Sequence, residues 1–176
     1  MPTNRKQIYS GKIVKLFVDR VEIQGESYLR EVVQHPGGVV ILAELEDNRI
    51  PFVRQLRYPL NKVLLELPAG KLEPGEDPRA GAAREMEEET GLRPLSLEHV
   101  FSFYPTPGFC DEILHLYYTT RLEPSSMSLE KDEEIVLEFH SLEEALEMSL
   151  RAEIMDGKTL MALFWLLWRK GTTTDN

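Results

Sequence analysis

The first part of the chain alternates between apolar and polar positions in a way that favours strands over helices. Apolar residues recur through 13–23, and the polar turn 24–26 separates them from a second alternating segment, 27–34. A period of two residues places side chains on the two faces of a strand in turn. We therefore expect a small antiparallel β subdomain within residues 1–35.

Beyond this subdomain, short apolar runs are separated by turns. The run 39–45 has the length of a strand and enough apolar residues to be buried on both faces. Strands followed by a helix, and helices at the end of the chain, favour an α/β/α sandwich around a mixed sheet. We assign 36–170 to this α/β domain and expect 171–176 to be a frayed tail. Its further strands are predicted at 50–55, 63–67, 95–104, 112–119 and 134–140.

Two helices are predicted near the C-terminus. Ser141 suits the N-cap of the first, which runs to about residue 150, and Glu144 completes a capping box three residues later. The second helix covers about 158–169. Its large apolar side chains are interpreted as core or partner contacts: Leu160, Met161, Phe164, Leu167 and Trp168.

A loop and helix between residues 69 and 92 carry the clearest local signals in the chain. Asp77 is a good N-cap, and Pro78 suits the first helical position, where no amide donor is needed. Gly91 supplies the stop at the C-terminal end. One stripe of this helix is predicted to pack inward: Ala82, Ala83, Met86 and Thr90.

The opposite side of the same helix is acidic. Glu85, Glu88 and Glu89 are spaced so that their side chains can converge, whereas Glu87 faces elsewhere. Arg84 can offset part of their repulsion by pairing with Glu88 one turn on. Clustered carboxylates suit Mg²⁺, which takes oxygen ligands. On the helix alone, a solvated acidic face is the alternative, and it is the commoner outcome of such a charge run.

Composition narrows the class of protein. With 176 residues the chain can form a compact domain with a core. Its net charge of −10 disfavours nucleic-acid binding, which usually needs a basic face. Cys110 is the single cysteine, so no internal disulfide can form, which fits a cytoplasmic location. The N-terminus lacks an apolar signal core, and the run 160–168 is too short to span a membrane.

The spacing Gly-x5-Glu-x7-Arg-Glu-Met-x-Glu-Glu-x-Gly-Leu, which begins at Gly70, resembles the Nudix box at every defining position. In that family the box is a loop–helix–loop that binds Mg²⁺ or Mn²⁺, and the enzymes hydrolyse a nucleoside diphosphate linked to another moiety. The resemblance also implies the α/β/α fold. It makes Arg84 a residue that orients the carboxylates and Glu76 a support for the loop. The implied metal ligands are Glu85, Glu88, Glu89 and the backbone carbonyl of Ala69.

Segments outside the box resemble ADP-ribose pyrophosphatases in particular. These are 54–59, 66–71, and Pro107, which lies sixteen residues past Gly91. Cys110 departs from the small hydroxyl residue that is commoner in that loop. The resemblance implies hydrolysis of ADP-ribose to AMP and ribose 5-phosphate, and a homodimer whose N-terminal strands help to form the partner's site. The alternatives are another nucleoside diphosphate sugar as substrate, or a nucleotide-binding protein without catalysis.

Three further roles follow from the residues and this resemblance. Arg54 is the favoured phosphate contact, because guanidinium groups match phosphate oxygens, with Arg57 as the weaker candidate. An ion pair with an acidic residue is the alternative for Arg54. Because the loop containing Pro107 faces the ligand in the relatives, Pro107 joins the substrate-binding candidates. The predicted catalytic residues are Arg84, Glu85 and a general base, for which we favour Glu133 over the neighbouring Glu134; a solvated acidic loop is the alternative for Glu133.

Overall fold

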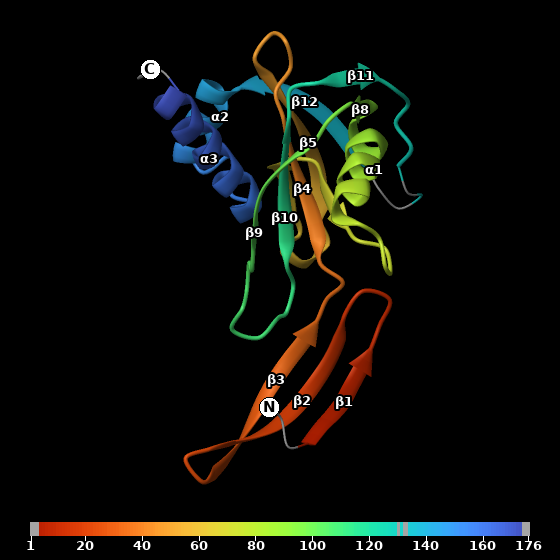
Figure 1. The fold of residues 1–176 in the computed structure, drawn as a ribbon, viewed down its shortest axis with the longest axis vertical. Coiled ribbons are helices and arrows are strands. Elements are labelled where there is room, and N and C mark those ends of the chain that lie inside the picture. The colour runs from red at the N-terminus through yellow and green to blue at the C-terminus, as the bar shows by residue number, and fades with distance from the viewer. Residues whose placement is uncertain (1–3, 130, 132–133, 174–176) are drawn as a thin grey trace.

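A computed structural model describes residues 4–129, 131 and 134–173 of the chain (Figure 1). Residues 4–34 form a three-stranded antiparallel sheet that projects from the rest of the molecule. It attaches through β3, where the Val33 N–H donates to the Phe109 carbonyl at 2.7 Å and the Asp111 N–H donates to the Val33 carbonyl at 3.1 Å. Its strands are β1 (Asn4–Ser10), β2 (Lys15–Ile23) and β3 (Glu26–Gln34).

The centre of the molecule is a mixed sheet with strand order β7-β4-β10-β9. β4 runs parallel to β10, and the two outer strands run antiparallel to their neighbours. All six residues of β4 are buried, as its apolar run predicts. The four strands are β7 (Ala69–Lys71), β4 (Gly38–Ala43), β10 (Leu114–Thr119) and β9 (Glu98–Phe103).

Helices cover both faces of this sheet, which confirms the α/β/α sandwich (Figure 1). Val39, Ile41 and Ala43 of β4 pack in one cluster with α1 (Pro78–Thr90). The alternate residues Val40 and Leu42 pack in a second cluster, to which α2 (Leu142–Leu150) and α3 (Gly157–Thr173) contribute. Alternation along one buried strand therefore divides the core into two layers.

Two smaller sheets complete the α/β domain. One is antiparallel with order β12-β5-β6, and a short helical turn η1 (Tyr58–Leu60) joins β5 to β6. The other pairs β8 with β11, two three-residue strands that the sequence does not predict. Their bounds are β5 (Arg49–Arg57), β6 (Lys62–Glu66), β12 (Ile135–Ser141), β8 (Leu92–Pro94) and β11 (Leu122–Pro124).

The helix caps form as the sequence predicts. Asp77 Oδ1 accepts from the N–H groups of Arg79 at 3.0 Å and Ala80 at 3.2 Å. At the other end of α1, Gly91 has φ +68°, a left-handed conformation that favours glycine. The capping box of Ser141 and Glu144 is also present at the start of α2.

The buried face of α3 differs from the expected one. The prediction that the large apolar side chains of this helix lie in the core is wrong for four of them, whose exposed fractions are 41–66%: Met161, Phe164, Leu167 and Trp168. The face turned inward instead carries Thr159, Ala162, Leu163 and Leu166. The helix also ends at Thr173, later than predicted. Within the described ranges, no helix has the length and apolar content needed to cross a membrane.

Candidate active site

A cleft of about 990 Å³ brings several of the predicted site residues together. It is bounded by β7 and α1, by the end of β5, and by the start of α3. Glu133 lies outside the described residues, and neither Arg54 nor Pro107 is among the lining residues. Those that do line the cleft are Arg57, Ala69, Arg84, Glu85, Glu88 and Glu89.

The side chain of Glu85, on α1, packs against the short strand β7. Antiparallel pairing holds β7 against β4. A Cβ atom at Gly70 would lie only 2.0 Å from the carboxyl carbon of Glu85. No such contact is tolerated between real atoms, so the absence of a side chain at Gly70 makes room for this carboxylate. The first glycine of the box therefore acts directly on the position of a predicted metal ligand.

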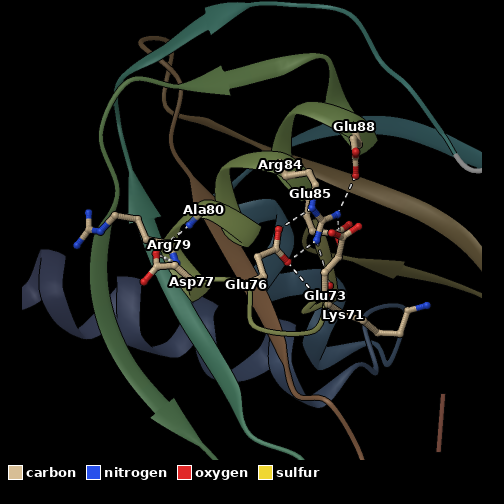
Figure 2. A network of polar contacts seen from close by, with 9 residues as sticks. All are labelled: Lys71, Glu73, Glu76, Asp77, Arg79, Ala80, Arg84, Glu85 and Glu88. Atoms are coloured by element: carbon tan, nitrogen blue, oxygen red, sulfur yellow. Dashed lines mark hydrogen bonds and ion pairs between the residues drawn. The ribbon is translucent and has the colours of Figure 1, made fainter.

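Arg84 is the hub of the polar network in the box (Figure 2). Its Nε and Nη2 donate to the two carboxylate oxygens of Glu76 at 2.8 and 2.9 Å. Its Nη1 donates to Glu85 at 2.7 Å and to Glu88 at 3.0 Å, and Nη2 also reaches the Lys71 carbonyl at 3.2 Å. One guanidinium thus ties the loop before α1 to two of the helix carboxylates.

Glu76 in turn fixes the loop. Its Oε2 accepts from the Glu73 N–H at 2.9 Å while both its oxygens receive Arg84. The hydrogen bonds from Arg84 hold the pKa of Glu76 below its ordinary value, against the opposing effect of burial. The carboxylate therefore stays charged and keeps the loop attached to the helix.

Glu89 is the most enclosed of the three carboxylates. It is 3% exposed, and its Oε2 accepts from the Ala69 N–H at 2.9 Å. This contact joins β7 to the last turn of α1, so the strand and the helix position each other. Glu89 brings a buried carboxyl group to the same cleft as Glu85 and Glu88.

The donor set suits a hard divalent cation, because carboxylate and carbonyl oxygens are the ligands that Mg²⁺ and Ca²⁺ take. The space over Gly70 that Glu85 fills supports this fit. Across the part of the chain that the structure describes, no three His, Cys, Asp or Glu side chains already gather around one point. Glu85 and Glu88 are instead turned to Arg84.

Another part of the cleft carries positively charged side chains, which a buried carboxylate holds in place. Glu66 is 1% exposed and accepts from Nε and Nη2 of Arg57, both at 2.7 Å. Lys158 contacts the same carboxylate and lies 3.0 Å from Asp156. Burial raises the pKa of Glu66, but the attraction of Arg57 and Lys158 outweighs it and lowers the pKa overall. Neither Glu66 nor Lys158 is among the residues predicted from the sequence; for Glu66, a charged residue inside the apolar strand 63–67 was the available signal.

The structure changes the order of the two arginine candidates. Arg54 Nε donates to Glu138 at 2.5 Å and its Nη2 at 3.0 Å, so the ion-pair alternative is present. Arg54 and Arg57 are three residues apart on β5 and point to opposite faces of the strand, because side chains alternate. Of the two, Arg57 lines the cleft. The alternation of side chains along a strand was the sequence signal that could have separated Arg54 from Arg57.

Comparisons with known proteins agree with this geometry. The NUDIX domain matches residues 34–163. A methanol dehydrogenase activator of Bacillus methanolicus is 46% identical over 92% of this chain and 89% of its own length. An ADP-ribose pyrophosphatase of Bacillus subtilis (strain 168) is 41% identical over 92% of this chain and 89% of its own.

A solved structure of an ADP compounds hydrolase gives a TM-score of 0.85, covering 98% of this chain and 95% of that one. Its sequence is 18% identical, so this likeness concerns the fold alone. The domain match spans well over half of the chain, and it includes the loop–helix unit that holds Glu85, Glu88 and Glu89. The chain therefore belongs to the NUDIX domain family.

Proposed function

We propose that this protein hydrolyses the pyrophosphate bond of ADP-ribose, giving AMP and ribose 5-phosphate, with Mg²⁺ as its cofactor and Mn²⁺ as a substitute. The observation that carries the proposal is one cleft with two chemically different parts. The box carboxylates lie in one, and Arg57 and Lys158 lie in the other. A pyrophosphate-bridged nucleotide needs both cation-mediated neutralisation and direct donors to its oxygens. The ADP-ribose pyrophosphatase relative supports this choice of substrate.

Glu85, Glu88, Glu89 and the Ala69 carbonyl would hold the divalent cation. When bound, the cation would neutralise charge on the phosphate oxygens and lower the pKa of a coordinated water. Arg84 positions Glu85 and Glu88 through the hydrogen bonds described above.

Arg57 is the direct phosphate contact in this proposal. Its two hydrogen bonds to Glu66 use one N–H of Nε and one of Nη2. Since a guanidinium carries five N–H donors, three remain for substrate oxygens. Glu66 also fixes the orientation of the guanidinium plane, which lowers the entropic cost of binding. Arg54 and Pro107 remain weaker substrate-binding candidates.

Glu133 is proposed as the general base. The proposal rests on the family resemblance, because this residue lies outside the described part of the chain. Two residues further on, Ile135 pairs with Gln55 of β5, and Gln55 lines the cleft. Ile135 is thus held close to the cleft, which supports the proposal. Glu134, which is exposed, is the neighbouring alternative.

The test is incubation of the purified protein with ADP-ribose and Mg²⁺, followed by separation of the products. We expect AMP and ribose 5-phosphate, with Glu89→Gln as the control for contaminating activity. Glu133→Gln in the same assay should lower kcat by about a hundredfold or more while KM changes little, because a general base acts on the chemical step. Turnover of another nucleoside diphosphate sugar but not of ADP-ribose would support pyrophosphate hydrolysis and contradict ADP-ribose as the substrate. If no compound in a broad panel is turned over with Mg²⁺ or Mn²⁺, both the hydrolysis and the substrate are contradicted.

We also propose a cytoplasmic homodimer. Apolar side chains are exposed on the N-terminal sheet, including Ile8, Tyr9 and Leu29, and on α3, where Phe164 is 56% and Trp168 66% exposed. Exposed apolar surface of this kind is typical of an interface. The free thiol of Cys110 fits a reducing compartment, which cell fractionation would check. Light scattering should give a mass near twice the 20.3 kDa of one chain; a mass of one chain at micromolar concentration would contradict the dimer.

A further inference from the structure

One polar group in the cleft lacks any hydrogen-bond partner. The Nε2 atom of the Gln55 side chain is fully buried, and no atom of the described residues accepts a hydrogen bond from it. Gln55 lines the same cleft as the box carboxylates. Buried polar groups in folded proteins are nearly always paired, because an unpaired donor loses its hydration without compensation. An exception calls for an explanation, such as a functional role or a bound group that supplies the missing partner.

The backbone holds Gln55 firmly in this position. Gln55 lies in the middle strand of the β12-β5-β6 sheet, paired with Leu64 on one side and Ile135 on the other. It shares a face of β5 with Arg57, two residues further on, and both side chains line the cleft. Leu56, between them, does not. The carboxamide is therefore presented to the cleft by a regular strand rather than by a loop.

The neighbours of Gln55 indicate which chemical group would pair with it. Residues two apart on a strand are separated by about 7 Å, a distance that a diphosphate with its flanking oxygens can bridge. Arg57 and Lys158, both anchored on Glu66, supply cations in the same part of the cleft. Together these three side chains form a donor wall of an amide, a guanidinium and an ammonium, which matches the acceptor oxygens of a phosphate.

We propose that the Gln55 carboxamide is a substrate-binding group, whose Nε2 donates to a phosphate oxygen of the nucleoside diphosphate sugar next to the phosphate held by Arg57. This inference rests on the proposed function and adds a residue that selects for the diphosphate. As a neutral donor, Gln55 adds a directed hydrogen bond without a further charge. Because Nε2 has almost no accessible surface in the structure, the carboxamide must turn toward the cleft when substrate binds, and Nε2 then gains a partner.

The test compares Gln55→Met with the wild-type protein in ADP-ribose turnover and in thermal unfolding. Methionine has a similar volume and no donor. We expect kcat/KM to fall about tenfold, mainly through KM, and Tm to stay the same or rise, because an unpaired buried donor has been removed. Glu147→Met, at an exposed position of α2 that does not line the cleft, is the control and should change neither quantity appreciably.

A second variant distinguishes a donor from an acceptor. Gln55→Glu keeps the shape but offers only acceptor oxygens and a negative charge. Next to a phosphate it should lower kcat/KM further than Gln55→Met does, by about a hundredfold relative to wild type. If Gln55→Glu matches wild type, the carboxamide does not donate to a phosphate, and the proposal is overturned.

The remaining outcomes separate this inference from the proposed function. If wild type turns over ADP-ribose and Gln55→Met has the same kcat/KM, Gln55 has no part in binding. A Tm that falls by several degrees with unchanged kinetics would mean that the amide has a structural partner, which equally overturns the role. A wild-type protein that neither binds nor turns over ADP-ribose would overturn both proposals.

Discussion

Replacing Gly70 with alanine should lower kcat by about a hundredfold or more while leaving the fold intact. The new methyl group would lie 2.0 Å from the Glu85 carboxyl carbon and 2.1–2.2 Å from its oxygens. These atoms are the end of a flexible side chain, so Glu85 can swing aside without moving the backbone. Displacement of a catalytic group by about 1 Å is enough to cost two orders of magnitude in rate.

The stability of the Gly70→Ala variant separates this effect from misfolding. Gly70 is not among the glycines with positive φ, so alanine can adopt its backbone conformation. We therefore expect Tm to change by a few degrees at most. Gly171→Ala, in the last turn of α3, is the matched control, because its Cβ would meet nothing within 4 Å. Activity of Gly70→Ala within threefold of wild type would show that Glu85 need not occupy the space over Gly70.

Features with local causes are predictable from the sequence. The helix α1 begins and ends where Asp77 and Gly91 place it, since capping depends on a few neighbouring residues. The burial of β4 on both faces follows from its apolar run alone. The acidic side of α1 likewise follows from spacing, because Glu85, Glu88 and Glu89 are fixed relative to one another by the helix.

Features that depend on distant partners are not predictable in this way. β7 has only three residues and exists because β4, 29–33 residues earlier in the chain, pairs with it. The apolar residues of α3 surround most of the helix, so sequence periodicity could not decide that Leu163 and Leu166 face the core while Phe164 and Trp168 are exposed. Strand alternation places Arg54 and Arg57 on opposite faces of β5, but only the packing of β5 in the fold decides that Arg57 is the one that lines the cleft.

Glu66 is buried against cations from two distant parts of the chain, and its replacement should have the largest effect on stability. Glu66→Gln keeps the shape but removes the carboxylate that pairs with Arg57 and one of the two that pair with Lys158, which still lies 3.0 Å from Asp156. Lys158 is 12% and Arg57 37% exposed. Breaking a buried ion pair from one side costs about 3–5 kcal/mol, and the partial exposure of Arg57 reduces this to about 2–3 kcal/mol. Tm should fall by roughly 5–10 °C.

The same carboxylate gives the effect a pH dependence with a defined sign. The folded-state pKa of Glu66 lies below its ordinary value of 4.5 because Arg57 and Lys158 outweigh the effect of burial. The ion pairs therefore stabilise the fold fully above pH 4.5, and this stabilisation is lost as the pH falls through the lower, folded-state pKa. The difference in unfolding free energy between wild type and Glu66→Gln should be largest near pH 7 and shrink below pH 4.5.

Urea denaturation at pH 7 and at successively lower pH measures this difference directly. Glu147→Gln is the matched control, because its ion pair with Arg151 is exposed on both sides and should contribute less than about 0.5 kcal/mol. Since Glu66 also orients Arg57, its replacement should raise KM for ADP-ribose at pH 7 as well. If Glu66→Gln is as stable as wild type at pH 7 but has a raised KM, Glu66 serves substrate binding. The free-energy cost of burying its charge would then equal the stabilisation from its ion pairs. Equal stability and equal KM would show that the ion pairs of Glu66 with Arg57 and Lys158 matter neither to the fold nor to substrate binding.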